Sequence, residues 1–189
     1  ENLGWANVHM NHVAAHVGVS LVDLHEHYHD MNAIADDWFS RALADMLVSP
    51  DKGFCNRPAK ERLFIVIMRW LDSLALHQQV SAQMINHKLF FFHPQHWLPV
   101  VSNLSTLVHW VLDAAMVSSQ GQQRRLEELG TTLLILATLR VWIKDDSESQ
   151  IRTRTFLQQQ LNKVEKVMQC LLPSSRPEDD KKTTSLNKP

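Results

Sequence analysis

Apolar residues recur at helical spacing through almost the whole of this 189-residue chain. In AKERLFIVIMRWLDSLALH, residues 59–77, an apolar face is formed by Leu63, Ile67, Trp70 or Leu71, and Leu74. Five glycines and seven prolines are few for this length, and long glycine-free stretches favour helix over strand. The sequence therefore predicts an all-α protein of about nine helices.

Glycine, proline and capping residues predict where these helices begin and end. A first short helix, 9–17, ends at Gly18, and Ser20 is a suitable N-cap for a second helix that ends near Tyr28. Ser147, with Gln150 three positions later, has the spacing of a capping box that opens the last helix. Other helices are expected at 30–47, 59–77, 79–90, 94–117 and 124–144, and the last helix is expected to reach residue 172.

Composition and motifs exclude several classes of protein. Hydrophobic residues make up 44% of the chain, and the net charge is −1, so the chain as a whole gives no sign of a polyanionic partner. No signal peptide is visible, and the uncharged segment 89–112 is broken by Pro94 and Pro99, which disfavours a transmembrane helix. Cys55 and Cys170 lack metal-type spacing, and no catalytic motif occurs. We expect a cytoplasmic protein that is not an enzyme and has no cofactor.

The first part of the chain has the spacing of a helix-turn-helix. In VAAHVGVSLVDLHEHY, residues 13–28, a helix is followed by a tight glycine turn and a second helix of about nine residues. This stretch resembles the signature of the TetR family, I-A-x-x-A-G-V-S-x-x-x-L-Y-x-H-F. The matching positions are Val13, Ala14, Gly18, Val19, Ser20, Leu24, His27 and Tyr28. Gly4 and Trp5 match the end of the family's first helix, so the rest of that helix is expected upstream of residue 1.

The resemblance covers almost the whole chain and implies a homodimer that binds palindromic duplex DNA. It implies a helix-turn-helix domain at 1–47, a helical ligand-binding and dimerisation domain at 56–172, and a disordered tail at 173–189. DNA contacts are expected from the recognition helix and its cap. Leu21 and Val22 suit thymine methyl groups, and Glu26 suits a cytosine amine. The predicted DNA-binding residues are Ser20, Leu21, Val22, His25, Glu26 and His27.

The middle helices are rich in aromatic and methionine residues, which form either ordinary core or the lining of a pocket for a small apolar molecule or lipid. The predicted ligand-binding residues are Phe64, Met68, Met84, Phe91, Trp97, His109 and Trp110. Between residues 129 and 139 the next helix is apolar nearly all round, so it needs cover from the centre of the molecule or from a second copy. The predicted dimer-interface residues are Leu129, Leu133, Leu136, Arg140 and Phe156.

The charge of the helix-turn-helix departs from that of a DNA-binding motif. No lysine or arginine precedes Arg41, and residues 1–40 hold six acidic residues and six histidines. Lysine and arginine supply most of the affinity for phosphates, whereas histidine, with an unperturbed pKa near 6.5, is mostly neutral at physiological pH. Two alternatives follow: the chain binds DNA with other help, such as a basic segment upstream, or the motif survives as scaffold only.

A second resemblance supports the alternative in which the motif survives as scaffold only. ERLFIVIMRWLDSL, VHWVLDAA and ATLRVWIKDDS are similar to a proteobacterial branch close to the ubiquinone-biosynthesis accessory proteins. These keep the TetR-like fold, and the resemblance implies lipid binding without DNA binding.

The histidines also raise the question of a metal site. His9, His12 and His16 can share one helical face, and His25 and His29 form a second pair with the spacing of zinc ligands. Solvated surface histidines explain the same pattern. We predict no metal site from it.

Overall fold

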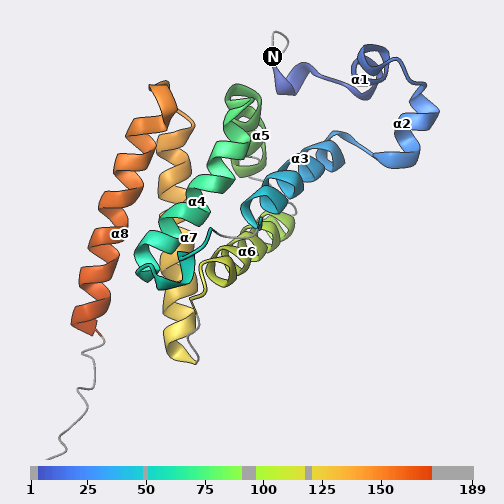
Figure 1. The fold of residues 1–189 in the computed structure, drawn as a ribbon. Helices are drawn as coiled ribbons and strands as arrows, with labels where there is room; N and C mark the ends of the chain where they lie inside the picture. Colours follow the sequence, from blue (N-terminus) through green and yellow to red (C-terminus); the bar gives the residue numbers. More distant parts are fainter. Residues whose placement is uncertain (1–3, 49–50, 91–96, 118–120, 172–189) are drawn as a thin grey trace, which may run out of the picture.

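The computed structural model describes residues 4–48, 51–90, 97–117 and 121–171. Within these ranges the chain forms eight α-helices and no strand, which confirms the all-α prediction (Figure 1). The helices are α1 (Met10–Val17), α2 (Leu21–His27), α3 (Met31–Met46), α4 (Ala59–Ala75), α5 (Gln78–Phe90), α6 (Trp97–Ala114), α7 (Gln122–Trp142) and α8 (Ile151–Leu171). Short 3-10 turns occur at η1 (Trp5–Asn7), η2 (Phe54–Asn56) and η4 (Glu148–Gln150).

Helix α4 lies at the centre of the bundle and contacts α3, α5, α6 and α8 (Figure 1). It carries the apolar face predicted from its sequence, and its side chains Ile67, Leu71 and Leu74 are almost fully buried. The same core takes in Leu112 of α6, Trp142 of α7 and Leu157 of α8. Burying a side chain of this size stabilises the folded state by about 1.5–3 kcal/mol, so this core holds the bundle together.

Helices α1 and α2 stand apart from the bundle, beyond the far end of α3 (Figure 1). They pack against each other, whereas α3 packs along α4 and so belongs to the bundle. The preceding turn, η1, instead lies against α5, where the Gln83 side chain accepts a hydrogen bond from the Trp5 backbone N–H. The helix-turn-helix is therefore attached to the body from two sides, through α3 and through η1.

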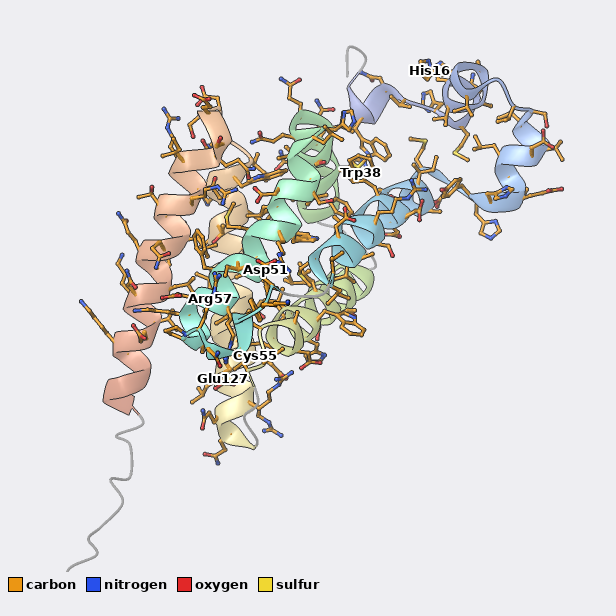
Figure 2. The ribbon with its side chains drawn as sticks, in the orientation of Figure 1. His16, Trp38, Asp51, Cys55, Arg57 and Glu127 are labelled. Atoms are coloured by element: carbon orange, nitrogen blue, oxygen red, sulfur yellow. The ribbon has the colours of Figure 1, made fainter. Side chains whose placement is uncertain are left out.

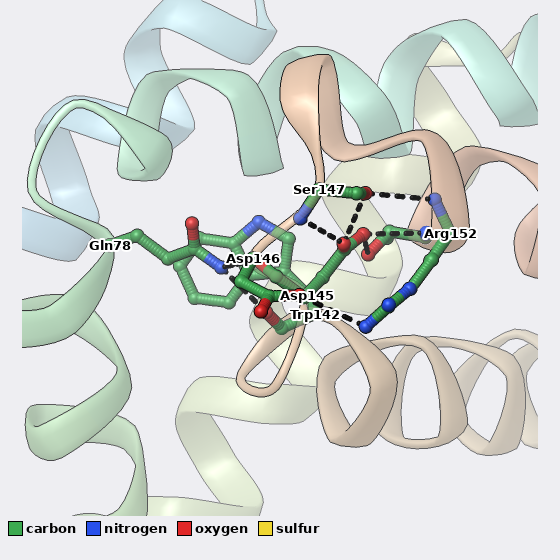
Figure 3. Close-up of polar contacts among 7 residues, drawn as sticks. Gln78, Trp142, Asp145, Asp146, Ser147 and Arg152 are labelled. Carbon is green, nitrogen blue, oxygen red and sulfur yellow. Dashed lines mark hydrogen bonds and ion pairs between the residues drawn. The ribbon is translucent and has the colours of Figure 1, made fainter.

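A buried polar corner joins α7 to α8 (Figure 3). Asp145 is 3% exposed, and its Oδ2 accepts hydrogen bonds from the backbone N–H and the hydroxyl of Thr153, at 2.7 and 2.6 Å. Gln78 of α5 donates to the carbonyl oxygens of Trp142 and Asp145 at the end of α7. Asp145 thus caps the start of α8, and Gln78 caps the end of α7.

The predicted capping box of Ser147 and Gln150 is wrong. The Ser147 hydroxyl does not pair with Gln150: it donates to Asp145 and accepts from the Arg152 N–H at 3.3 Å. The Gln150 side chain accepts from the Trp142 indole at 2.7 Å and donates to Asp72 of α4 at 2.9 Å. Both Ser149 and Gln150 have positive φ, which sets the sharp turn between the helices. Because the Gln150 side chain bonds to residues far away in the chain, it does not pair with Ser147 as its spacing predicted.

Candidate nucleic-acid interface

The turn between α1 and α2 is built by Gly18 and Ser20. Gly18 has φ 80°, a left-handed conformation that ends α1, and its N–H donates to the Ala14 carbonyl at 2.9 Å. Ser20 then opens α2 with a full capping box: its hydroxyl accepts from the Asp23 N–H at 3.1 Å, and its own N–H donates to Asp23. Both roles were predicted from the sequence and are confirmed.

Helix α2 buries Leu24 and exposes its other residues. Leu24 is 9% exposed and Ala14 of α1 is 4% exposed where the two helices pack together, whereas Val22 is 69% exposed. The predicted DNA-contacting residues all lie exposed on α2 or at its cap, namely Ser20, Leu21, Val22, His25, Glu26 and His27. An exposed row on the second helix of a helix-turn-helix is the surface that enters the major groove in this motif.

The end of α2 is tied to α3 by a polar cluster. The Tyr28 hydroxyl donates to Asp37 Oδ2 at 2.7 Å, and Arg41 donates to the same oxygen at 2.8 Å. The hydrogen bond from Tyr28 is the main cause that holds the pKa of Asp37 below its usual value, and Arg41 acts in the same direction. Arg41, the first arginine of the chain, is therefore already paired with a carboxylate.

The histidines of this end lie at the surface, and Figure 2 shows His16 on α1, away from the bundle. The rings of His9 and His12 have centroids 5.5 Å apart, and those of His25 and His29 are 5.6 Å apart. Among the described residues, no group of three or more histidine, cysteine or acidic side chains is arranged to hold a metal ion.

Helix α3 is fixed to the bundle along its length. Trp38, labelled in Figure 2, donates from its indole to the buried Ser81 hydroxyl of α5 at 3.0 Å, and its ring meets the His77 ring edge-on. Near the other end, Ser73 of α4 donates to Asp45, and Arg69 donates to the Val48 carbonyl. Sequence reasoning missed the Trp38–Ser81 contact, because a serine within a helical pattern carries no sign of its distant partner.

The predicted ligand-binding residues do not all face the same way in the single chain. Met68 and Met84 are buried, and Phe64 packs on the core. His109 and Trp110 are exposed on α6, where His109 Nε2 lies 3.3 Å from Glu128 Oε1 of α7. Phe91 lies outside the described residues, as does the side chain of Trp97. The described residues line an open pocket of about 440 Å³ between η1 and α5, formed by Gly4, Trp5, Ala6, Asn7, Gln83, Asn86 and His87.

Helix α7 is buried on one side only. Leu134, Ile135 and Leu139 enter the core, whereas the predicted interface residues Leu129 and Leu133 are 58% and 59% exposed. Leu126 continues this apolar stripe, Arg140 is also exposed, and Leu136 and Phe156 are half-buried. No helix in the described part of the chain is long and apolar enough to cross a membrane.

Comparison with known proteins shows the family to which the chain belongs. No protein-family model matches the chain, and no curated protein matches it. Among solved structures, the chain is similar to the TetR transcriptional regulator from Nitrosomonas europaea, with a TM-score of 0.73 and 32% sequence identity. The match covers 85% of this chain and 88% of that one. With its helix-turn-helix and helical bundle, the chain belongs to the TetR family of transcriptional regulators, which are not enzymes.

Proposed function

We propose that the chain is a homodimeric transcriptional regulator that binds palindromic duplex DNA through α2 and responds to a small apolar ligand. The observation that carries the proposal is the exposed face of α2, presented by a fully formed turn and cap. Ser20, His25 and His27 supply polar groups there, and Leu21 and Val22 supply apolar ones. Polar groups of this kind suit base edges or phosphates, and the apolar ones suit thymine methyl groups in the major groove.

The exposed stripe on α7 supports the homodimer. Leu126, Leu129 and Leu133 together expose a row of large apolar side chains on a helix whose other side enters the core. Soluble chains rarely leave such a row uncovered, and a two-fold axis covers it with its own copy. The dimer then presents two copies of α2, as palindromic DNA requires.

Helix α3 is the element through which a ligand in the bundle would act on DNA binding. It contacts the end of α2 through Tyr28 and Asp37, and it contacts the bundle through Trp38 and Ser81. A ligand among α4–α6 that favours one position of α3 favours one separation of the two α2 helices. This is a population shift between two dimer geometries, and it is driven by the ligand's preference for one of them.

Selection of duplexes from a random pool by the full-length protein tests this function. We expect enrichment of a palindrome, and we expect Val22→Glu to abolish its binding because the new carboxylate is repelled by the negatively charged duplex. Leu76→Glu is the matched control, since Leu76 is 79% exposed at the end of α4, a different helix within the bundle. A pool that stays random, or equal binding by both variants, contradicts the proposal.

A lipid-binding accessory protein that no longer binds DNA is a second candidate. The absence of lysine and arginine before Arg41 favours it, as does the pairing of Arg41 with Asp37. Organic extraction of the purified protein followed by mass spectrometry separates the two candidates: a stoichiometric lipid together with an unenriched duplex pool supports the accessory role.

A further inference from the structure

The exposed surface of the α1–α2 unit carries histidine where a DNA-binding surface usually carries lysine and arginine. His9, His12, His16, His25, His27 and His29 are all exposed, and they equal in number the acidic residues of the first forty positions. Phosphate binding needs cations at this surface. In this part of the chain, the imidazole side chain is the group that can become a cation, by taking up a proton.

Several acidic groups near these histidines are already engaged by donors of the fold. Asp23 accepts from the Ser20 N–H and hydroxyl, chiefly the hydroxyl, which lowers the pKa of Asp23. Asp30 caps α3 by accepting from the Ala33 N–H at 2.8 Å. Asp37 is held by Tyr28 and Arg41. Among the described residues of this end, the other carboxylates are Glu26, exposed on α2, and Asp36, exposed on α3.

The histidines themselves fall into two groups. His9 and His12 form a capping box on α1 in which each ring accepts from a backbone N–H, so protonation removes the acceptor that the cap uses. In contrast, His27 Nδ1 lies 3.0 Å from the Asp23 carbonyl oxygen and donates to it, which leaves Nε2 to receive a second proton without loss of that bond. His16, His25 and His29 are exposed outside the box.

The pair His25 and His29 favours joint binding of protons and phosphate. Their ring centroids lie 5.6 Å apart, so two protonated rings repel each other across this distance. A phosphate oxygen near both rings offsets that repulsion. Each ligand therefore strengthens the binding of the other, as linkage requires.

We propose that protonated His16, His25, His27 and His29 supply the phosphate contacts of this chain, so that DNA binding is coupled to proton uptake. The inference rests on the proposed DNA-binding function. The partner is the phosphate backbone of duplex DNA, which these contacts hold independently of sequence.

Anisotropy titrations of the full-length protein with a labelled random duplex test the coupling. We expect binding at about pH 5.5 to be at least tenfold tighter than at about pH 8. The dependence of log affinity on log salt should steepen by about 0.9 for each additional phosphate neutralised. Replacing all four histidines (His16→Gln, His25→Gln, His27→Gln, His29→Gln) should remove both differences, whereas His87→Gln on α5 should keep them. Circular dichroism at both pH values checks that each variant is folded.

A variant with added positive charge gives a second, independent test. His25→Arg with His29→Arg places permanent cations at the same positions, so binding at about pH 8 should rise toward the acidic value. Equal wild-type binding at both pH values overturns the inference and leaves the DNA-binding function standing. Persistence of the pH effect in the fourfold glutamine variant also overturns it. Absence of binding at either pH overturns the inference and the proposed function together.

Discussion

The Trp38 indole of α3 donates a hydrogen bond to the buried Ser81 hydroxyl of α5 across 3.0 Å. Ser81 in turn donates to the Leu74 carbonyl at the end of α4, at 3.2 Å. This chain of two bonds joins the helix that follows the helix-turn-helix to the corner between α4 and α5. It therefore fixes one position of α3 on the bundle.

Trp38→Phe should lower the free energy of unfolding by about 1 kcal/mol, because it removes one hydrogen bond and keeps the aromatic ring. Ser81→Ala should lower it by about 1–3 kcal/mol, because it leaves the indole N–H without its partner. Urea denaturation of both single variants and of the double variant gives the coupling energy. Strictly additive effects in this cycle contradict a direct role for the bond.

Because of Asp145, the free energy of unfolding should fall at acid pH. Burial alone would raise the pKa of Asp145, but hydrogen bonds from Ser147 and Thr153 outweigh it and lower that pKa from 3.8 to about 2. A folded-state pKa below the unfolded one contributes stability that is present above about pH 4 and is lost as the pH falls toward 2. A shift of this size is worth about 2 kcal/mol. Urea denaturation at several pH values should show this loss.

Asp145→Asn should remove that stability at neutral pH and flatten the acid dependence between about pH 4 and 2. The neighbouring Asp146 is the matched control, because its carboxylate is 85% exposed in an ion pair with Arg152 (Figure 3). Asp146→Asn should change the free energy of unfolding by less than about 1 kcal/mol. Equal effects of the two variants would show that the hydrogen bonds to the Asp145 carboxylate are not the cause of the acid dependence.

Leu129→Glu should convert the proposed dimer into a monomer that stays folded. Leu129 is more than half exposed in the single chain, so the change costs little within one copy. Each leucine buried in an interface contributes about 1.5–3 kcal/mol, so loss of two by symmetry raises the dissociation constant more than tenfold. Sedimentation velocity should show the change for Leu129→Glu and not for Leu76→Glu. A monomeric wild type, or a dimer unaffected by Leu129→Glu, contradicts this interface.

Ser20→Ala should weaken DNA binding by fraying the first turn of α2. The variant loses the bond from the Asp23 N–H, which is worth about 1 kcal/mol at an N-cap, and affinity should fall about fivefold to tenfold. Ser20→Thr keeps a hydroxyl that caps the helix and should keep most of the affinity. Anisotropy with the selected duplex measures both. An unchanged affinity in Ser20→Ala would show that α2 needs no preformed cap.

Local signals in the sequence predicted the elements well where the partner of a residue lies within one helical turn. Gly18, Ser20 and Asp30 end or cap helices as their residue types favour, and α3 and α5 begin within one residue of the expected positions. Two polar side chains of the apolar helix α6 instead lie in pairs with α7, His109 with Glu128 and Asp113 with Arg124.

Distant pairings escaped prediction, because spacing along the chain does not encode them. Gln150 has the spacing of a capping residue, yet Trp142 and Asp72 occupy its side chain. The sequence around Trp38 gives no sign of a polar partner, yet its indole N–H donates to the buried Ser81 hydroxyl. The ligand-binding residues, the dimer interface and the DNA contacts stay predictions, since each depends on a second molecule.

Binding of the full-length protein to a labelled random duplex, titrated from about 50 to 200 mM salt, tests the central claim most directly. The titration is carried out at about pH 5.5 and about pH 7.5, and it tests whether a helix-turn-helix without lysine or arginine binds DNA. The account predicts binding that weakens linearly in log affinity against log salt, and that is lost in Val22→Glu and kept in Leu76→Glu. No binding at the lowest salt at either pH would contradict it and would leave the motif as scaffold in a lipid-binding protein.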